Sequence, residues 1–247
     1  STSNRIWSFW EISLYTSFFC NFIFSSPCNP SGSVYSKEEL KGLVEVFEKY
    51  PNCYIISDEI YEYITYSGRH ESIAQFESIK DRVIVVNGLS KGFAMTGWRL
   101  GFMAAPEPII KACERIQGQF TSGANSITQR AAITALTGDL EPTFAMRKKF
   151  EERRNFVINA FDEINGIDLE LPLGAFYAFP DVSAYFGKNG INNSEDMSMH
   201  ILNNAHVSTV YGSAFGDNNA IRISYAASMP QLQEAMNRIK KLLHESN

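Results

Sequence analysis

The chain has 247 residues, of which 45% are hydrophobic and 20% are charged, and its formal net charge is −5. This composition is typical of a globular protein with a buried core, built as one large domain or as a medium domain plus a smaller one. No long run of one charge sign occurs, so we expect neither nucleic acid nor an anionic membrane surface as a partner. The cysteines and histidines show no metal-ligand spacing, which predicts free thiols in a reducing compartment and no metal site.

Residues 6–24 form an unusually apolar and aromatic segment. Its length approaches the roughly 20 apolar residues of a membrane span. However, Glu11 interrupts it, and Arg5 alone is a poor basic region for a secretory signal. We therefore expect no membrane anchor. Instead, we predict a buried strand at residues 22–25, preceded by an atypical N-terminal segment at residues 1–21.

From residue 22 onward, short apolar strands alternate with amphipathic helices. Ser36 and Glu39 form a capping-box pattern, and the helix that they open carries apolar residues at helical spacing. The β-branched run at 83–86 is typical of a parallel strand that is covered on both faces. In chain order, the pattern predicts strands at 22–25, 53–57, 83–86 and 100–105, and helices at 36–47, 107–119 and 124–138.

The C-terminal part of the sequence has a different character. A long helix is predicted at 142–164, followed by a strand at 175–179, a loop rich in Gly and Asn at 187–193, a helix at 194–205, strands at 207–211 and 220–225, and a last helix that includes 232–242. We predict an α/β fold, with a mainly parallel sheet followed by a smaller α+β unit. The predicted domains are 22–145, the partial large domain, and 146–247, the connecting helix with the small C-terminal domain.

Polar side chains follow the predicted strands of the first sheet. Asn29 follows the first strand, Asp58 and Tyr61 follow the second, and Ser90 and Lys91 follow the third. Ligands of open α/β sheets bind beyond the carboxyl ends of the strands. We therefore expect an amide, a carboxylate, a phenol and an amine to meet there. Arg99 lies eight positions after Lys91, at the start of the next predicted strand.

Four segments carry a family resemblance. They are Asn29-Pro30-Ser31-Gly32, the run Ser57 to Tyr61, the run Asn87 to Gly101 that contains Lys91, and Arg222-Ile223-Ser224-Tyr225. In order and spacing they resemble the class I aminotransferases of pyridoxal-phosphate (PLP) fold type I. The resemblance runs from about residue 22 to the end. It is greatest to the prokaryotic-type aspartate aminotransferases, including plant and bacterial enzymes that also accept prephenate.

The resemblance implies a role for each residue on the cofactor side. Lys91 would hold PLP as a Schiff base and shuttle the substrate proton. Asp58 would pair with the pyridinium nitrogen, so that the ring can accept electrons. Tyr61 and Asn29 would hydrogen-bond the 3′ oxygen of the cofactor. The alternative interpretations are a solvated lysine, a helix-capping aspartate, a core tyrosine and a turn asparagine.

Further residues would bind the phosphate and the substrate. Arg99 would bind the cofactor phosphate with charge-assisted hydrogen bonds. Ser90 is a weaker phosphate ligand, because some relatives carry a hydroxyl three residues before the lysine, where this chain has Gly88. Arg222 would bind the α-carboxylate of the amino acid, which Asn29 could also contact. Tyr211 stands where relatives usually have proline, in the loop on the substrate side.

The implied reaction is transamination of an L-amino acid, expected to be aspartate, with 2-oxoglutarate, in a cytoplasmic homodimer. The resemblance also implies a long stretch ahead of Asn29 that this sequence lacks, including residues that cradle the phosphate and stack on the cofactor ring. We therefore expect the isolated chain to bind PLP weakly or not at all. Two alternatives stay open: a PLP-dependent lyase of the same fold, and a non-catalytic fragment.

Overall fold

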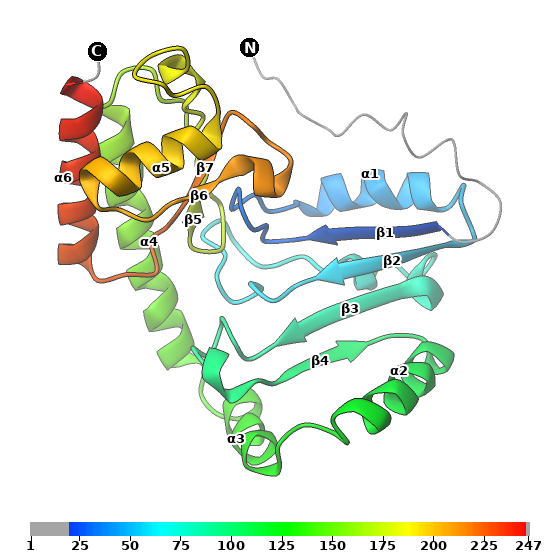
Figure 1. Ribbon diagram of the computed structural model, residues 1–247. Coiled ribbons are helices and arrows are strands. Elements are labelled where there is room, and N and C mark those ends of the chain that lie inside the picture. Colours follow the sequence, from blue (N-terminus) through cyan, green and yellow to red (C-terminus); the bar gives the residue numbers. More distant parts are fainter. Residues whose placement is uncertain (1–19, 246–247) are drawn as a thin grey trace.

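The computed structural model describes residues 20–245, so most of the atypical N-terminal segment lies outside the described residues. Two sheets and their helices follow one another along the chain (Figure 1). The strands are β1 (Cys20–Ser25), β2 (Cys53–Asp58), β3 (Val83–Gly88), β4 (Gly101–Ala104), β5 (Tyr177–Ala178), β6 (Val210–Tyr211) and β7 (Ile221–Ser224). The helices are α1 (Lys37–Phe47), α2 (Glu107–Phe120), α3 (Ser126–Thr137), α4 (Glu141–Asp162), α5 (Ser194–Ala205) and α6 (Met229–Glu245).

The first sheet has the order β1-β2-β3-β4. Strands β1, β2 and β3 are parallel, whereas β4 runs antiparallel to β3. The prediction of a mainly parallel sheet is therefore confirmed. Because the register pairs Ser25 with Asp58 and Asp58 with Val86, the carboxyl ends of β1, β2 and β3 lie side by side. The residues that follow these three strands start from one edge of the sheet.

Helix α1 covers one face of this sheet. The predicted capping box is present: the Ser36 hydroxyl accepts from the Glu39 amide, and the Glu39 carboxylate accepts from the Ser36 amide. Each hydrogen bond satisfies a backbone donor at the helix end. The helix buries Leu40, Val44 and Phe47. They pack in one cluster with residues of β1, β2 and β3 that point to this face, which include Phe22, Ile55 and Val83.

The opposite face of the sheet is uncovered among the described residues. Ile23, Ile56 and Ile84 lie in register across β1, β2 and β3, and the next row contains Val86. Ile23 is 68% exposed and Val86 is 38% exposed. The prediction that residues 83–86 are covered on both faces is therefore wrong. The β-branched residues of β3 suit a strand that is buried on both faces, but the described residues bury only the face that packs against α1.

The C-terminal unit has its own core. Helices α4, α5 and α6 pack around a short antiparallel sheet of order β5-β7-β6. Helix α5 occupies the predicted residues. The strands β5, β6 and β7 are shorter than predicted, because only the residues within their observed bounds pair with a neighbouring strand. Tyr61 and Ile64, which follow β2 in the chain, belong to this second core. The loop after β2 thus connects the two cores physically.

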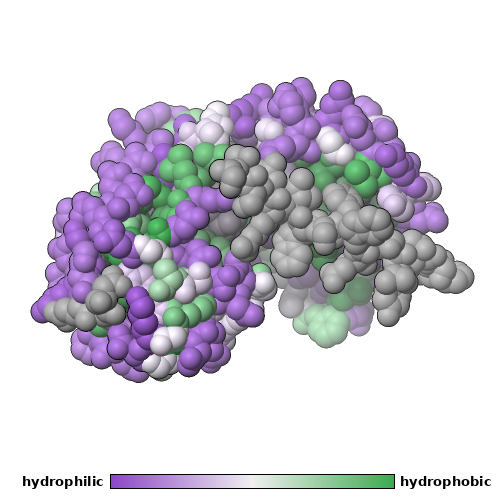
Figure 2. All heavy atoms as spheres, turned by 90° about the horizontal axis from the view of Figure 1, so that it is seen from above, coloured by the Kyte–Doolittle hydropathy of each residue, from purple (hydrophilic) through white to green (hydrophobic). Residues whose placement is uncertain are grey.

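The outer surfaces of α1 and of the C-terminal helices are mainly hydrophilic, with small apolar patches, when the molecule is seen from above (Figure 2). All four cysteines are free, as predicted. Within residues 20–245, no helix combines the length and the apolar character needed to cross a membrane.

Candidate active site

Lys91 lies beyond the end of β3, and its amine faces aromatic rings of the second core. The Nζ atom is 5.9 Å from the ring centre of Tyr61 and 5.7 Å from that of Phe176. Its side chain is only partly exposed, and among the described residues it forms no ion pair. Aromatic faces attract a cation weakly and leave its hydrogen-bonding capacity free. The lysine amine is therefore available to a ligand.

Tyr61 is buried and bonded to a second tyrosine that the sequence analysis missed. Its hydroxyl lies 2.9 Å from the hydroxyl of Tyr177 on β5. Burial raises the pKa of Tyr61 above its ordinary value, and the hydrogen bond to Tyr177 raises it further, while Arg222 opposes the shift. The carboxylate of Asp58 also raises this pKa, although least of these causes. Asp58 and Arg222 thus both influence the pKa of Tyr61.

Arg222 on β7 is held between two rings and one amide. Its guanidinium carbon is 4.6 Å from the ring centre of Tyr177 and 4.9 Å from that of Phe215. The Nη1 atom donates a 2.8 Å hydrogen bond to the side-chain oxygen of Asn29. The Nε atom is buried and has no partner within the described part of the chain. A buried N–H without a partner is costly, so this atom is suited to bind a carboxylate oxygen.

The turn that carries Asn29 is docked firmly onto the second unit. Leu173 and Gly174 both donate backbone hydrogen bonds to the carbonyl of Gly32. Gly32 has a φ of +72°, and a Cβ at this position would lie 2.6 Å from Cβ of Pro172. Only glycine fits this conformation and this close approach. The docked turn explains how Asn29 reaches Arg222 across the two units.

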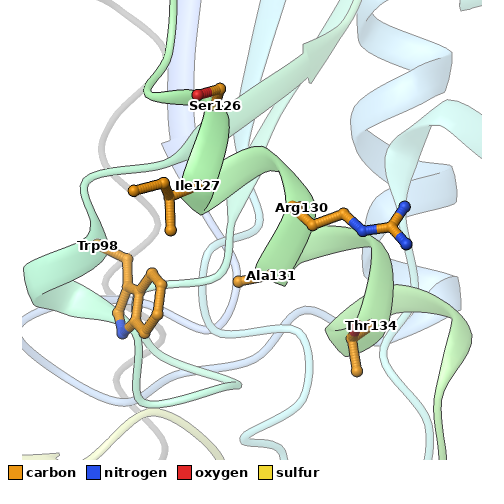
Figure 3. A pocket seen from close by; sticks show the side chains of 6 residues that line it. All are labelled: Trp98, Ser126, Ile127, Arg130, Ala131 and Thr134. Atoms are coloured by element: carbon orange, nitrogen blue, oxygen red, sulfur yellow. The ribbon is translucent and has the colours of Figure 1, made fainter.

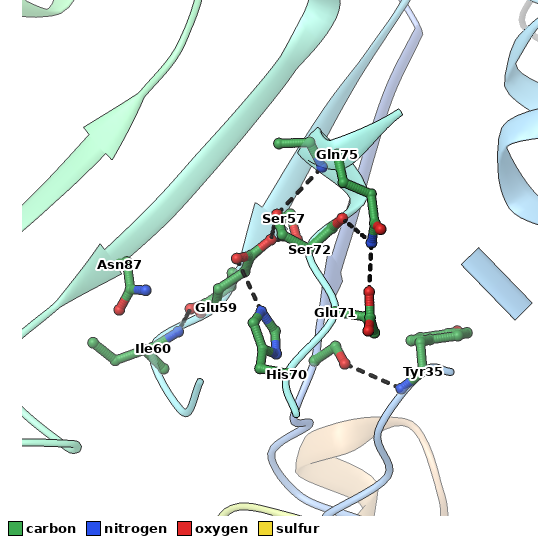
Figure 4. Close-up of polar contacts among 12 residues, drawn as sticks. Tyr35, Ser57, Glu59, Ile60, His70, Glu71, Ser72, Gln75 and Asn87 are labelled. Carbon is green, nitrogen blue, oxygen red and sulfur yellow. Dashed lines mark hydrogen bonds and ion pairs between the residues drawn. The ribbon is translucent and has the colours of Figure 1, made fainter. Parts of the chain in front are cut away.

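Asp58 and its neighbour Glu59 have different environments. Asp58 is the last residue of β2 and accepts a hydrogen bond from the backbone N–H of Ile60 in the turn that follows, so it caps no helix. Glu59 is buried and accepts from the hydroxyls of Ser57, at 3.0 Å, and Ser72, at 2.6 Å (Figure 4). His70 lies 3.0 Å from its second oxygen. This buried network fixes the backbone directly after Asp58.

A metal site is not needed to explain these side chains. Glu59, Glu62 and His70 offer ligand atoms within 4.8 Å of one another. Both carboxylate oxygens of Glu59 already accept hydrogen bonds or face His70. We therefore interpret the group as a hydrogen-bonded network that supports the end of β2.

Arg99 and Ser90 are linked to each other through Thr96, and they are separate from the contacts that join the other predicted residues. The guanidinium of Arg99 donates to the carbonyl of Thr96, whose hydroxyl donates to the carbonyl of Ser90. Arg99 is exposed and has a left-handed φ of 56°, at the end of a short 3-10 helix. It therefore lies two residues before β4, close to its predicted position at the start of that strand. Its phosphate role stays a prediction.

The contacts thus bring together Lys91, Tyr61, Arg222 and Asn29, with Asp58 as an electrostatic neighbour. Sequence reasoning missed Tyr177, which touches both Tyr61 and Arg222. The signal for it was weak, because an aromatic residue in a short apolar run is usually a core residue.

Comparison with known proteins shows which family the chain matches. The family described as "Aminotransferase class I and II" matches residues 17–239. A "Bifunctional aspartate aminotransferase and glutamate/aspartate-prephenate aminotransferase" of Petunia hybrida is 49% identical over 232 residues, which cover 90% of this chain and 48% of the relative. An aspartate/prephenate aminotransferase of Nitrosomonas europaea is 45% identical over 230 residues, which cover 90% of this chain and 58% of the relative.

Solved structures agree with the sequence comparison. The crystal structure of the aspartate aminotransferase from Rhizobium meliloti superposes with a TM-score of 0.89 at 38% identity, over 92% of this chain and 58% of that chain. The chain therefore spans about half the length of the curated relatives that it matches. By its sequence and its fold, the chain belongs to the class I and II aminotransferase family.

Proposed function

We propose that this chain is the part of a PLP-dependent aspartate-type aminotransferase that carries the cofactor lysine and the carboxylate-binding arginine. The observation that supports the proposal best is the convergence of Lys91, Tyr61 and Arg222 through shared aromatic neighbours. The names of the relatives support aspartate as the amino acid. A cytoplasmic homodimer is part of the proposal and follows from the resemblance alone.

The side chains present fit such a cofactor and its substrate. The site offers an amine, a phenol, a carboxylate and a guanidinium. Among the described residues the amine has no ion pair and the buried Nε atom of the guanidinium has no partner. When bound, PLP would supply the electron sink that labilises the Cα–H bond of an amino acid. Lys91 would bind it covalently, and Asp58 would hold a proton on its ring nitrogen.

The remaining residues would orient the substrate and move its proton. Arg222 would bind the α-carboxylate through Nε and a second guanidinium N–H, and Asn29 fixes the plane of the guanidinium. The Lys91 amine would take the proton from Cα of the substrate and pass it to C4′ of the cofactor. Tyr61, buried and protonated, would donate a hydrogen bond to the phenolic oxygen of the cofactor.

Covalent labelling tests the cofactor part of the proposal. Because the isolated chain is expected to bind PLP weakly at most, reduction is used to trap even a weakly populated Schiff base. The purified chain is incubated with increasing PLP, reduced with borohydride, digested and mapped by mass spectrometry. We expect labelling of Lys91 to saturate at lower PLP concentrations than labelling of Lys111, an exposed lysine paired with Glu107. Lys91→Arg removes the preferred site, and Lys111→Arg is the matched control. Equal labelling of the two lysines at every concentration would contradict the assignment.

Product analysis tests the reaction type. With L-aspartate and bound PLP but no oxo acid, a transaminase releases oxaloacetate up to the amount of cofactor and no ammonia. A lyase releases ammonia continuously. Ammonia release that exceeds the amount of cofactor would reject transamination in favour of the lyase.

A further inference from the structure

Two of the four cysteines lie beside each other on the first two strands. The register of the parallel strands β1 and β2 pairs Cys20 with Cys53. Neighbouring strands of a sheet lie about 4.7–4.9 Å apart, and the Cα atoms of a disulfide usually lie about 4.4–6.8 Å apart. The backbone therefore holds these two residues at a separation that a disulfide bond can span.

The two thiols contact each other but differ in their access to solvent. Cys53 is 3% exposed, whereas Cys20 is half-buried. The pKa of the Cys53 thiol is raised to about 12 by burial first, and then by its hydrogen bond with the Cys20 thiol and by the charge of Cys20. The two sulfur atoms are thus within hydrogen-bond reach of each other. A reagent in solvent meets Cys20 first, and Cys53 lies behind it.

A buried cation lies next to this pair. Arg82 is 8% exposed, and among the described residues no ion pair includes it. Its guanidinium donates hydrogen bonds to three backbone carbonyls, which are those of Tyr50 at 2.7 Å, Phe47 at 2.9 Å and Cys53 at 3.1 Å. The charge of Arg82 lowers the pKa of the Cys53 thiol and so opposes the effect of burial. A positive charge beside a thiol favours the thiolate, which is the form that attacks a disulfide.

The cysteine pair is separate from the candidate active site. Cys53 begins β2 and Asp58 ends it, so the two are about 17 Å apart at roughly 3.3 Å per residue. The open hollow of about 510 Å³ between Trp98 and α3 has no cysteine among its lining residues (Figure 3). Chemistry at the pair can therefore be followed without a ligand in either place.

We propose that Cys20 and Cys53 form a reversible dithiol–disulfide site that reacts with low-molecular-weight disulfides. The Cys20 thiolate attacks one sulfur of the reagent, forms a mixed disulfide with it and releases the other half of the reagent as a thiolate. The Cys53 thiolate then attacks the Cys20 sulfur, forms the Cys20–Cys53 bond and releases the second half as a thiolate. The two cysteines lose two protons and two electrons, and the reagent gains both and becomes two thiols.

Oxidation of the purified chain tests this site without cofactor or activity. The variant Cys28→Ser/Cys113→Ser retains Cys20 and Cys53 alone, because the chain has four cysteines. It is incubated with oxidised glutathione at neutral pH, alkylated, digested and mapped without reduction. We expect the Cys20–Cys53 peptide to be the main product, to form at a rate independent of protein concentration, and to disappear with dithiothreitol. Cys53→Ser in the same background should instead trap glutathione on Cys20.

The same variant unfolded in urea is the matched control for the role of the fold. We expect the folded pair to be half-oxidised at an oxidised-glutathione concentration about tenfold lower than the unfolded pair, at a fixed concentration of reduced glutathione. An equal or higher requirement in the folded chain would overturn the proposal. So would glutathione that stays on Cys20 while the Cys53 thiol is intact, or a disulfide between two copies of the chain.

Discussion

The hydroxyl pair of Tyr61 and Tyr177 provides a measurable test of how the site is held. Tyr61 is 4% exposed and Tyr177 is 7% exposed, and their oxygens are 2.9 Å apart. Changing either one to phenylalanine leaves the other hydroxyl buried without a partner, which costs about 1–3 kcal/mol. Changing both removes the unsatisfied group together with the hydrogen bond. The double variant should therefore be destabilised by clearly less than the sum of the single variants.

Urea unfolding at neutral pH measures this coupling. The free energy of unfolding is obtained for the parent chain, Tyr61→Phe, Tyr177→Phe and the double variant, with a check that the denaturant slope is unchanged. We expect a coupling of about 1–2 kcal/mol, larger than the roughly 0.5 kcal/mol of independent sites. Tyr50→Phe, at a 45% exposed position, is the control and should change stability by less than about 0.5 kcal/mol. Additive single-variant effects would show that the two hydroxyls do not depend on each other.

Three other perturbations follow from the same contacts. Glu59→Ala leaves two hydroxyls and His70 without their buried acceptor and should cost about 3–5 kcal/mol in urea unfolding, whereas Glu77→Ala, in an exposed pair with Lys80, should cost under about 1 kcal/mol. Gly32→Ala should destabilise the chain by more than Gly68→Ala, because both have positive φ but only Gly32 would bring its Cβ into contact with Pro172; equal losses would contradict the close packing of the turn. Because the pKa of Tyr61 is raised on folding, the unfolded chain loses this proton first, so the free energy of unfolding should fall as pH rises above about 10. Tyr61→Phe should make that fall shallower, and an unchanged slope would count against a buried phenol.

Local signals predicted the helices well. Asn193 caps α5 with its side chain, and His206 ends it in a left-handed conformation, so both boundaries are set by residues next to the helix. The capping box of α1 is equally local. Strand lengths in the second sheet were less predictable. Residues 175–179 form one apolar run, but β5 pairs with β7 through only two residues, and pairing depends on a partner far away in the sequence.

The candidate site was predicted only in part for the same reason. Polar residues at strand ends can be identified from alternation and turns, which placed Asn29, Asp58 and Lys91 near one edge. The contact of Tyr177 with Tyr61 spans 116 residues of sequence, and it places a residue that follows β2 in the core of the C-terminal unit. Likewise, the composition of β3 indicates that it suits a fully apolar environment. The composition of β3 does not show which residues supply that apolar environment.

The hydrogen bond between Asn29 and Arg222 also has a consequence for the order of folding. It joins residues 193 positions apart, so the two partners emerge from the ribosome at very different times. Loop closure over such a distance is entropically costly, and contacts of this kind form late. During synthesis, the asparagine turn exists long before its arginine does. The geometry that joins Asn29 to Arg222 is therefore a property of a chain that has been synthesised at least through β7.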